Sequence, residues 1–371
     1  MMNYECFGKL GFGFMRLPRC NDKFDFSQIN EMVDLFIENG FDYFDTAYIY
    51  EGSEDALKKS LVERYPRHKY KVATKMPIYM LESSDGISNI FNTSMKRLGL
   101  DYIDNYLIHG IDKEQSEKAE VLGAWEFIFE QKQKGLIKNI GFSFHGVPED
   151  LESILSNHHD VDFVQIQINY IDWDSSDVQS RKLYDIVRKH KKPIVVMEPV
   201  KGGLLSSETS HIAELYRNVN PKASPASWAI RYVASLEGVD IVLSGMSSVE
   251  QVKDNIITMK EKEKLNENEL STIARAITIL NNTDGIQCTQ CGYCMSNCPK
   301  NLNISQFINL YNDYLTFGTT ANLKHMYDFF AGHGKTAVAC ISCYSCETRC
   351  PQKLKIVEVM SKISVLFDLE S

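Results

Sequence analysis

Eight of the ten cysteines in the 371-residue sequence stand in two matching groups near its end. CTQCGYCMSNCPK begins at Cys288 and CISCYSCETRCPQ begins at Cys340, and both follow the pattern C-x2-C-x2-C-x3-C-P. This spacing is typical of paired [4Fe–4S] clusters, in which the fourth cysteine of each group binds the cluster of the other group. The pattern predicts two [4Fe–4S] clusters, one on Cys288, Cys291, Cys294 and Cys350, and the other on Cys340, Cys343, Cys346 and Cys298.

Two zinc sites or disulfide bonds are the alternative interpretations of these cysteines. Zinc sites seldom repeat this triple spacing. The N-terminus, MMNYECFGKLGFG, has no secretory pattern, so we expect a cytoplasmic protein whose thiols stay reduced. The clusters are therefore the favoured interpretation. Cys6 and Cys20 match no ligand pattern, and we predict that they are buried thiols.

A second group of reactive side chains is spread over the first three quarters of the chain. Each of these polar residues stands at or near the end of a short apolar segment: Asp45, Lys75, His109, Ser143, Gln165 or Asn169, Glu198 and Ser244. One polar residue in such a place is usually part of a surface ion pair or a structural hydrogen bond. A series of them at successive segment ends indicates an active site.

The elements that must position these side chains are eight apolar segments separated by amphipathic helices. The strands are predicted at 10–17, 41–47, 70–75, 102–109, 137–143, 163–168, 193–198 and 239–245. Strands that are apolar on both faces and alternate with helices are typical of a parallel sheet. Eight such units predict an α/β fold, a closed (β/α)8 TIM barrel, whose active site lies at the C-terminal strand ends. An open doubly wound sheet is the alternative.

The cysteine-rich tail is predicted to be a separate domain. NNTDG, 281 to 285, interrupts the chain after a helical segment, so we place the boundary between a barrel domain, 1–281, and a C-terminal domain, 282–371. Between the cysteine groups, 303–315 and 320–330 have helical patterns. The tail therefore resembles the helical dicluster ferredoxin module of oxidoreductase subunits.

Three motifs of the barrel part resemble those of the aldo-keto reductase family. They are DTAYIYEGSE at 45–54, ATK at 73–75 and LIHG at 107–110, in the family's order, and the resemblance covers residues 8 to 280. It implies an oxidoreductase that acts on a small carbonyl or alcohol. It also implies a catalytic tetrad of Asp45, Tyr50, Lys75 and His109.

Carbonyl reduction needs a hydride donor and a proton for the developing alkoxide. A tyrosine hydroxyl with its ordinary pKa near 10 is a poor acid at neutral pH. A lysine ammonium about 4 Å away would contribute about 4 kcal/mol at an effective dielectric constant of about 20, or roughly three pKa units. We therefore predict that Tyr50 is the general acid, that Asp45 orients Lys75, and that His109 donates to the carbonyl oxygen.

The cofactor end of the barrel is predicted from four segments. GFSFHG and VQIQINY resemble the family's nicotinamide-binding strands, which implies roles for Ser143, Gln165, His145 and Asn169. EPVKGGLLS offers a glycine-bearing loop that can approach a diphosphate, with Pro199, Lys201 and Gly202. SGMSSVEQVKDN opens the last barrel helix and is a candidate phosphate site, with Ser244, Gly245, Ser247, Gln251 and Asn255. Its alternative interpretation is a capping box of Ser248 and Gln251.

The identity of the barrel cofactor stays open between NAD(P)H and FMN. NADPH-using relatives commonly carry an arginine in the last of these segments, whereas Lys253 is its only basic residue here. A flavin mononucleotide could use the same phosphate site.

The combination of barrel and clusters gives three hypotheses. A nicotinamide delivers a hydride, whereas each cluster passes one electron, and a flavin can connect the two. The first hypothesis is an oxidoreductase that exchanges electrons through its clusters with an external one-electron carrier protein. The second is an ordinary NAD(P)H-dependent reductase whose cluster domain is structural or redox-sensing. The third is a non-catalytic electron-transfer or regulatory subunit, which an intact tetrad disfavours.

Composition limits the partners. The net charge of −9 argues against nucleic acid or an anionic membrane surface. No apolar run approaches the roughly 18 residues that a membrane-spanning helix needs. We therefore expect neither nucleic acid nor membrane as a partner.

Overall fold

The computed structural model describes residues 9–21, 23–206, 208, 211–281, 285–317, 321–332 and 335–369. The chain divides into two compact units. The first runs to Val200 and continues from Ser206 to Ile273, whereas the second comprises Lys201–Leu205 and the chain from Ala274 onward. The chain therefore passes between the units three times. The predicted boundary at 281/282 stays a prediction, since residue 282 lies outside the described residues.

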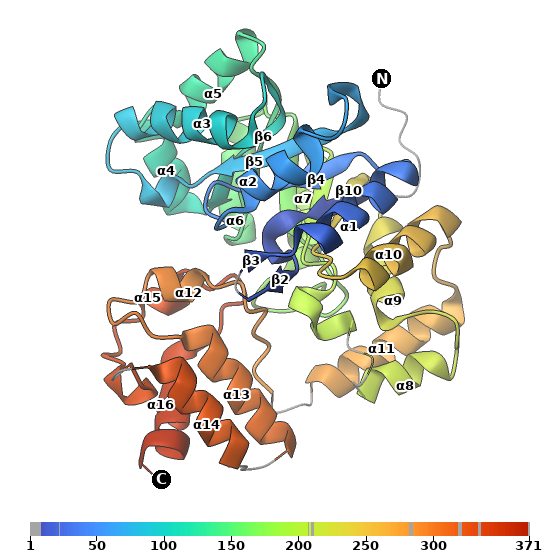
Figure 1. Cartoon of the computed structure of the whole chain (residues 1–371), viewed down its shortest axis with the longest axis vertical. Coiled ribbons are helices and arrows are strands. Elements are labelled where there is room, and N and C mark those ends of the chain that lie inside the picture. The colour runs from blue at the N-terminus through green and yellow to red at the C-terminus, as the bar shows by residue number, and fades with distance from the viewer. Residues whose placement is uncertain are drawn as a thin grey trace. The chain divides into compact units, whose positions relative to one another are not determined.

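The first unit is a closed barrel of eight parallel strands, several of which are labelled in Figure 1. β1 pairs with both β4 and β10, which closes the sheet and confirms the barrel over the open alternative. The strands are β1 (Lys9–Gly13), β4 (Tyr43–Asp45), β5 (Lys71–Met76), β6 (Ile103–Ile111), β7 (Ile137–Phe144), β8 (Phe163–Gln167), β9 (Ile194–Met197) and β10 (Val239–Ser244). All eight overlap the predicted segments. The small hairpin of β2 (Arg19–Cys20) and β3 (Lys23–Phe24) was not predicted.

The strands are buried on both faces, as their apolar sequences predict. One set of alternate positions forms a compact cluster of Tyr43, Ala73, Leu107, Phe163, Val195, Ile241 and Leu243. Positions one residue away, such as Phe44, Val72 and Tyr106, belong to the larger core shared with the helices. The two-residue alternation of strand side chains explains both clusters.

Helices fill the gaps between the strands. They are α1 (Phe26–Glu38), α2 (Ser53–Leu57), α3 (Asp85–Leu98), α4 (Lys113–Val121), α5 (Ala124–Gln133), α6 (Pro148–Asn157), α7 (Ser180–Lys189), α8 (His211–Arg217), α9 (Pro225–Ala234), α10 (Val249–Glu261) and α11 (Glu267–Asn281). In α1, Asp25 caps the first turn by accepting from the Gln28 N–H at 3.2 Å, and Asn39 is the C-cap that follows Glu38. Its apolar side chains recur at helical spacing and are buried.

The second unit is mainly helical, as predicted. Its helices are α12 (Tyr293–Ser296), α13 (Ile304–Phe317), α14 (Ala321–Ala331), α15 (Ser345–Thr348) and α16 (Ile356–Ser364). Tyr327 stacks on Phe367 and makes a tilted contact with Phe307 in its core, with ring centroids 4.8 Å apart in both pairs. None of the helices in the described ranges is long and apolar enough to span a membrane.

The two isolated cysteines differ from the prediction in one case. Cys20 is exposed on the β2–β3 hairpin, so the prediction that it is buried is wrong. Both residues of β2 are exposed, so this strand turns neither side chain toward the core. Cys6 lies outside the described residues.

Candidate active site and iron–sulfur sites

Asp45 and Lys75 form a buried ion pair at the ends of two neighbouring strands. Asp45 ends β4, and Lys75 lies in β5, which pairs with β4 in parallel. The fully buried Lys75 ammonium donates to Asp45 Oδ1 and, at 2.8 Å, to the carbonyl oxygen of Thr46. Burial raises the pKa of Asp45 and lowers the pKa of Lys75, and the attraction between the two groups opposes both shifts. The pair therefore holds the ammonium at a fixed point.

His109 lies where β6 departs from regular pairing. The register between β6 and β7 shifts between Ile108 and Ile111, and Gly110 has φ +61°. Such an irregularity redirects the side chains next to it. The Gly110 N–H donates to Ser143 Oγ at 2.8 Å. His109 is thus placed by a local distortion that a hydroxyl of the next strand stabilises.

The environment keeps the His109 imidazole neutral. Its side chain is only 3% exposed. Burial, followed by the nearby Lys75 and His145, lowers the pKa of His109 well below its ordinary value of 6.5. A neutral imidazole can donate one N–H without carrying charge.

Tyr50 completes the group. It lies in the turn after β4, where its N–H donates to the Ala47 carbonyl at 3.0 Å. Its ring stands edge-on to His109, with centroids 5.9 Å apart and an interplanar angle of 84°. Lys75 Nζ lies 5.4 Å from the centroid of the Tyr50 ring. The structure thus brings all four predicted residues together from three consecutive parts of the barrel.

Ser143 and Gln165 lie opposite each other on β7 and β8. They are register partners, and both are buried. Gln165 Nε2 contacts Met197 Sδ at 3.5 Å, whereas Gln165 Oε1 is buried with no hydrogen-bond partner among the described residues. An unsatisfied buried acceptor costs about 1–3 kcal/mol. A carboxamide, which offers both N–H and C=O, would satisfy it, so this part of the barrel fits the amide group of a nicotinamide.

Two further predicted residues lie beside this pair. The His145 N–H donates to the Ile111 carbonyl at 3.2 Å, which holds His145 next to the β6 distortion. Asn169 Nδ2 donates to Asp172 Oδ2 at 2.7 Å and to the Glu198 carbonyl at 3.1 Å. Asn169 Oδ1 accepts from the N–H groups of Ile171 and Asp172. The Asn169 amide therefore braces the turn after β8.

The loop after β9 has an unusual backbone. Glu198 and Lys201 have φ of +57° and +47°, and Gly202 and Gly203 follow with +66° and +104°. Pro199 is buried within this loop. From Lys201 onward the loop belongs to the second unit, where Lys201 Nζ donates to Gln352 Oε1 at 2.7 Å.

The segment between β10 and α10 is tied together by hydrogen bonds. Ser244 Oγ accepts from Asn255 Nδ2 at 2.7 Å, and Ser247 Oγ donates to the Arg16 carbonyl at 2.7 Å. Gln251 Oε1 accepts from the Ser247 N–H at 2.7 Å, and Ser248 caps α10. Gly245 is exposed, with open space where a Cβ would stand.

The segment between β10 and α10 was interpreted either as a helix cap or as a phosphate site, and these contacts can be compared with both. Ser248 is the N-cap of α10, so the helix cap is observed. The cap still leaves the positive end of the helix dipole at this point, which favours a nearby anion. The exposed Gly245 allows a close backbone approach, so the segment fits a phosphate as well.

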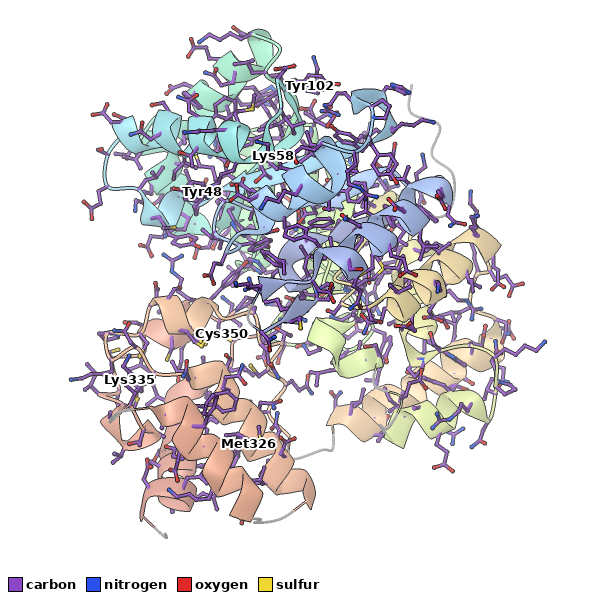
Figure 2. All side chains as sticks on the ribbon, viewed as in Figure 1. Tyr48, Lys58, Tyr102, Met326, Lys335 and Cys350 are labelled. Carbon is purple, nitrogen blue, oxygen red and sulfur yellow. The ribbon has the colours of Figure 1, made fainter. Side chains whose placement is uncertain are left out.

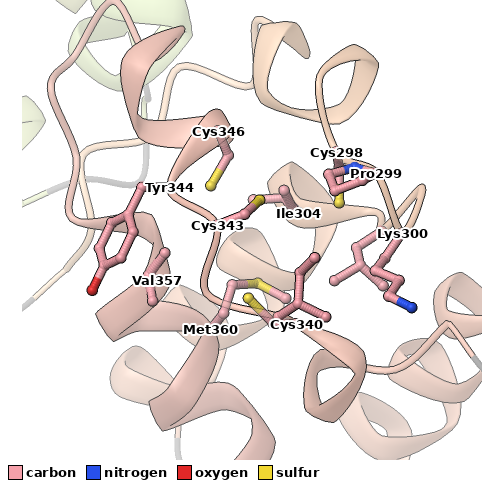
Figure 3. A pocket seen from close by; sticks show the side chains of 12 residues that line it. Cys298, Pro299, Lys300, Ile304, Cys340, Cys343, Tyr344, Cys346, Val357 and Met360 are labelled. Atoms are coloured by element: carbon pink, nitrogen blue, oxygen red, sulfur yellow. The ribbon is translucent and has the colours of Figure 1, made fainter.

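Four cysteines line one cavity of the second unit (Figure 3). They are Cys298, Cys340, Cys343 and Cys346, which is the set predicted for one cluster. Apolar side chains such as Ile304 and Met360 complete the wall of this cavity. Four thiols around a largely apolar space fit a [4Fe–4S] group held by cysteine sulfurs.

The other predicted set also lies together. Cys294 and Cys350 are buried in the second unit's core, and Cys288 packs against it; Cys350 is labelled in Figure 2. Burial raises the pKa of Cys294, and the neighbouring thiols raise it further: those of Cys291, Cys288 and Cys350 from the same predicted set, and that of Cys346 from the other. Thiols this close to one another fit iron, whose positive charge stabilises them as thiolates.

Two alternatives for the cysteines can be compared with the structure. The nine cysteines in the described ranges form no disulfide bond. Among the described residues, no three of His, Cys, Asp and Glu are arranged around a point that could hold a single metal ion. A [4Fe–4S] cluster is a larger group, and its four ligands each bind a different iron.

Sequence reasoning missed three contributors to these sites. Thr46 accepts from Lys75 through its backbone, and Gly110 shapes the β6 distortion. The Arg16 carbonyl holds Ser247 across 231 positions of sequence. The glycine in LIHG was a visible signal for Gly110, whereas backbone acceptors leave no signal in residue types.

The barrel matches the model of the aldo/keto reductase family over residues 9–278, and residues 287–354 match the 4Fe–4S dicluster domain. A TIM barrel with a tetrad of this kind followed by a ferredoxin-like domain defines an oxidoreductase of mixed architecture. The chain belongs to the aldo/keto reductase family, and it is an oxidoreductase enzyme with a C-terminal 4Fe–4S dicluster domain.

Several proteins are similar to the barrel part. An L-galactose dehydrogenase of Arabidopsis thaliana is 27% identical over 247 residues, which are 61% of this chain and 76% of that protein. An uncharacterized oxidoreductase of Bacillus subtilis is 24% identical over 275 residues, covering 65% and 85%. The crystal structure of an aldo-keto reductase from Klebsiella pneumoniae in complex with NADPH aligns with a TM-score of 0.58 at 19% identity, covering 75% of this chain and 95% of that one. This last likeness shows the fold.

Proposed function

We propose that the enzyme reduces or oxidises a small carbonyl or alcohol substrate in the barrel and exchanges the electrons through two [4Fe–4S] clusters. The observation that carries the proposal is the presence of two complete sets in one chain. The first unit gathers Asp45, Lys75, His109 and Tyr50, and the second gathers eight cysteines in two groups of four.

In the barrel, the chain's own residues handle the proton and the oxygen. The Lys75 ammonium favours the ionised form of the Tyr50 phenol, which makes Tyr50 a better proton donor to the developing alkoxide. Asp45 holds Lys75 in place, although its negative charge offsets part of this effect. Neutral His109 donates an N–H to the carbonyl oxygen, where negative charge develops.

A nicotinamide or flavin bound in the barrel would supply or accept the hydride. Ser143 and Gln165 would hold its amide group, and the β10–α10 segment, with Ser244, Gly245 and Ser247, would hold its phosphate. The unsatisfied Oε1 of Gln165 and the NADPH named in the Klebsiella pneumoniae structure support a nicotinamide. Passage of single electrons to the clusters supports FMN, so the proposal includes both.

The second unit supports exchange with an external one-electron carrier protein. Cys343, a predicted ligand, is exposed, and its neighbours Ile341 and Tyr344 are 56% and 55% exposed. Apolar side chains at the surface beside a redox group favour protein docking. Electrons could then enter or leave through the second cluster.

An ordinary NAD(P)H-dependent reductase with a structural cluster domain is the second candidate. It is favoured by the completeness of the tetrad within the first unit, since the chemistry needs no residue of the second unit. Under this hypothesis, removal of both clusters would leave NADPH-dependent turnover intact.

Turnover driven by a one-electron donor separates the two candidates. Anaerobically purified protein would receive reduced methyl viologen, without NAD(P)H, and a panel of small aldehydes and sugars that includes L-galactose and glyceraldehyde. We expect carbonyl reduction with two viologens oxidised per carbonyl, and loss of this activity when Cys291→Ser and Cys343→Ser remove both clusters. NADPH-driven reduction without any viologen-driven reduction would reject electron exchange through the clusters.

A further inference from the structure

We propose that Lys201 and Gly202 form part of the immediate surroundings of the first cluster, the one on Cys288, Cys291, Cys294 and Cys350, and that the Lys201 ammonium raises its reduction potential. This goes beyond the proposed function, although it depends on the cluster assignment made there. The sequence placed both residues in a diphosphate loop. Within the second unit, Lys201 contacts Gln352 and Gly202 contacts Thr289.

The ligands of the first cluster come from two chain segments, which we call its two arms: one around Cys288 and one around Cys350. Lys201 is a buried cation next to the Cys350 arm. Its side chain is 3% exposed, and Nζ donates to Gln352 Oε1 at 2.7 Å. Gln352 is itself buried and stands two positions after the predicted ligand Cys350. The hydrogen bond therefore fixes the ammonium beside the turn that carries this ligand.

Gly202 packs against the Cys288 arm of the first cluster. A Cβ at this position would lie 2.6 Å from Thr289 Cα and 2.7 Å from the Thr289 carbonyl oxygen. Thr289 is buried and directly follows the predicted ligand Cys288. Since Gly202 also has φ +66°, both the backbone conformation and the close approach require glycine.

The two contacts together join segments that are far apart in sequence. Cys288 and Cys350 are separated by 62 positions, yet one cluster must bind both. Lys201 and Gly202 touch residues next to each of these ligands. The loop therefore holds the two arms in the arrangement that the cluster needs.

The charge of Lys201 has a direct electrostatic consequence. A cluster becomes more negative by one charge when it accepts an electron. A nearby buried cation stabilises that reduced form, because the interaction is weakly screened away from water. The reduction potential of the first cluster should therefore be higher with Lys201 than without it.

The test of the charge is a redox titration monitored by EPR on the full chain. The signal of the first cluster is identified by its loss in Cys291→Ser. We expect Lys201→Met to shift the potential of this cluster to a lower value and to leave the second cluster unchanged. Lys201→Arg should keep the potential of the first cluster close to its wild-type value, because arginine retains the positive charge. Lys362→Met, which removes an exposed lysine of the same unit, should move neither potential.

The test of the close approach is the iron content after anaerobic purification. Gly202→Ala should lose about half of the iron, since the first cluster's arms are forced apart. Gly135→Ala is the matched control, because Gly135 has φ +77° but no atom within 4 Å of the point where a Cβ would stand. It introduces the same backbone strain without a clash and should keep the full iron content.

Four outcomes would overturn the proposal, and the first three differ from failure of the proposed function. Equal shifts of both clusters in Lys201→Met, or no shift in either, would remove the local effect of the charge. Full iron content in Gly202→Ala would remove the role of the contact. Wild-type protein without iron–sulfur clusters would reject the cluster assignment itself, whereas absent viologen-driven turnover alone would leave this inference standing.

Discussion

At the scale of residues, the barrel site depends on one charged group held in an apolar interior. Lys75 is fully buried, and its pairing with Asp45 and the Thr46 carbonyl compensates for the lost hydration. Removal of one partner of a buried ion pair costs about 3–5 kcal/mol. Substitution of Lys75 or Asp45 would therefore disturb folding together with chemistry, and Tyr50 is the better residue for a test of mechanism.

Tyr50→Phe removes the hydroxyl that we propose as the proton donor and keeps the ring that contacts His109. We expect carbonyl reduction to fall by about 10²–10⁴-fold in kcat, the usual contribution of a general acid, while cofactor affinity stays within about twofold. Steady-state kinetics and cofactor titration measure the two effects. Tyr102→Phe, at a half-buried tyrosine beside Arg67, is the control and should behave as wild type. Near-normal turnover of Tyr50→Phe would exclude this phenol as the acid.

The state of His109 predicts a pH dependence. Its folded pKa lies below the unfolded value, so below pH 6.5 the unfolded chain binds a proton that the folded chain does not. Above pH 6.5, protonation of His109 therefore costs no free energy of unfolding. Below pH 6.5, the free energy of unfolding falls by up to about 1.4 kcal/mol per pH unit, until the pH reaches the pKa of His109 in the folded protein. In ¹⁵N NMR, with the signal assigned through His109→Gln, we expect a neutral imidazole at pH 6.5. An imidazolium signal at that pH would contradict the assignment.

At the scale of elements, the site depends on one irregular strand. β6 departs from its register with β7 at His109 and Gly110, and Ser143 of β7 takes the Gly110 N–H. In a regular strand, the Gly110 N–H would donate to a backbone carbonyl of the neighbouring strand. The side chains next to it would then point to other faces of the sheet. The distortion, more than the barrel as such, sets the direction of the His109 imidazole.

Gly110→Ala tests this dependence. There is room for the methyl group, because its nearest neighbour would be His145 Cδ2 at 3.8 Å. The positive φ still strains the alanine by about 1 kcal/mol, so we expect the backbone to relax and turnover to fall by at least about tenfold. Gly40→Ala, with φ +86° and no close neighbour, should lose similar stability in thermal unfolding and keep full turnover. Equal turnover in both variants would show that the distortion does not position His109.

The sequence predicts the elements and the identity of the tetrad better than it predicts their contacts. The eight strands are recognisable because each is an apolar run between helices, and α1 follows from its helical spacing. The β2–β3 hairpin is too short for any periodicity to show. The contact of Ser247 with Arg16 joins positions 231 residues apart through a backbone oxygen, which residue types cannot reveal.

The loop after β9 shows the same limit most clearly. Its glycines predict a close backbone approach, and such an approach is found. Within the second unit, Gly202 approaches the backbone of Thr289, a neighbour that the sequence did not predict, and the diphosphate contact predicted for this loop stays a prediction. Glycine residues in a sequence indicate a backbone that another group can approach closely, but only the folded structure shows which group this is.

At the scale of the whole molecule, the chain combines hydride chemistry with one-electron carriers. The first unit brings Tyr50 and Lys75 together in the barrel, and the second carries the eight cysteines that we propose as cluster ligands. The chain passes between the units three times, since Lys201–Leu205 leaves the barrel sequence to join the second unit. This connectivity makes the second unit more than a C-terminal extension, and it favours a functional coupling of the two.

Freeze-quench EPR during the first turnover tests that coupling most directly. Enzyme with oxidised clusters would be mixed anaerobically with an alcohol that it is shown to convert, and samples would be frozen over the first turnover. We predict that the signal of reduced clusters grows at the rate of product formation, and that Tyr50→Phe slows both together. Clusters that stay oxidised while wild-type enzyme forms product would contradict the account.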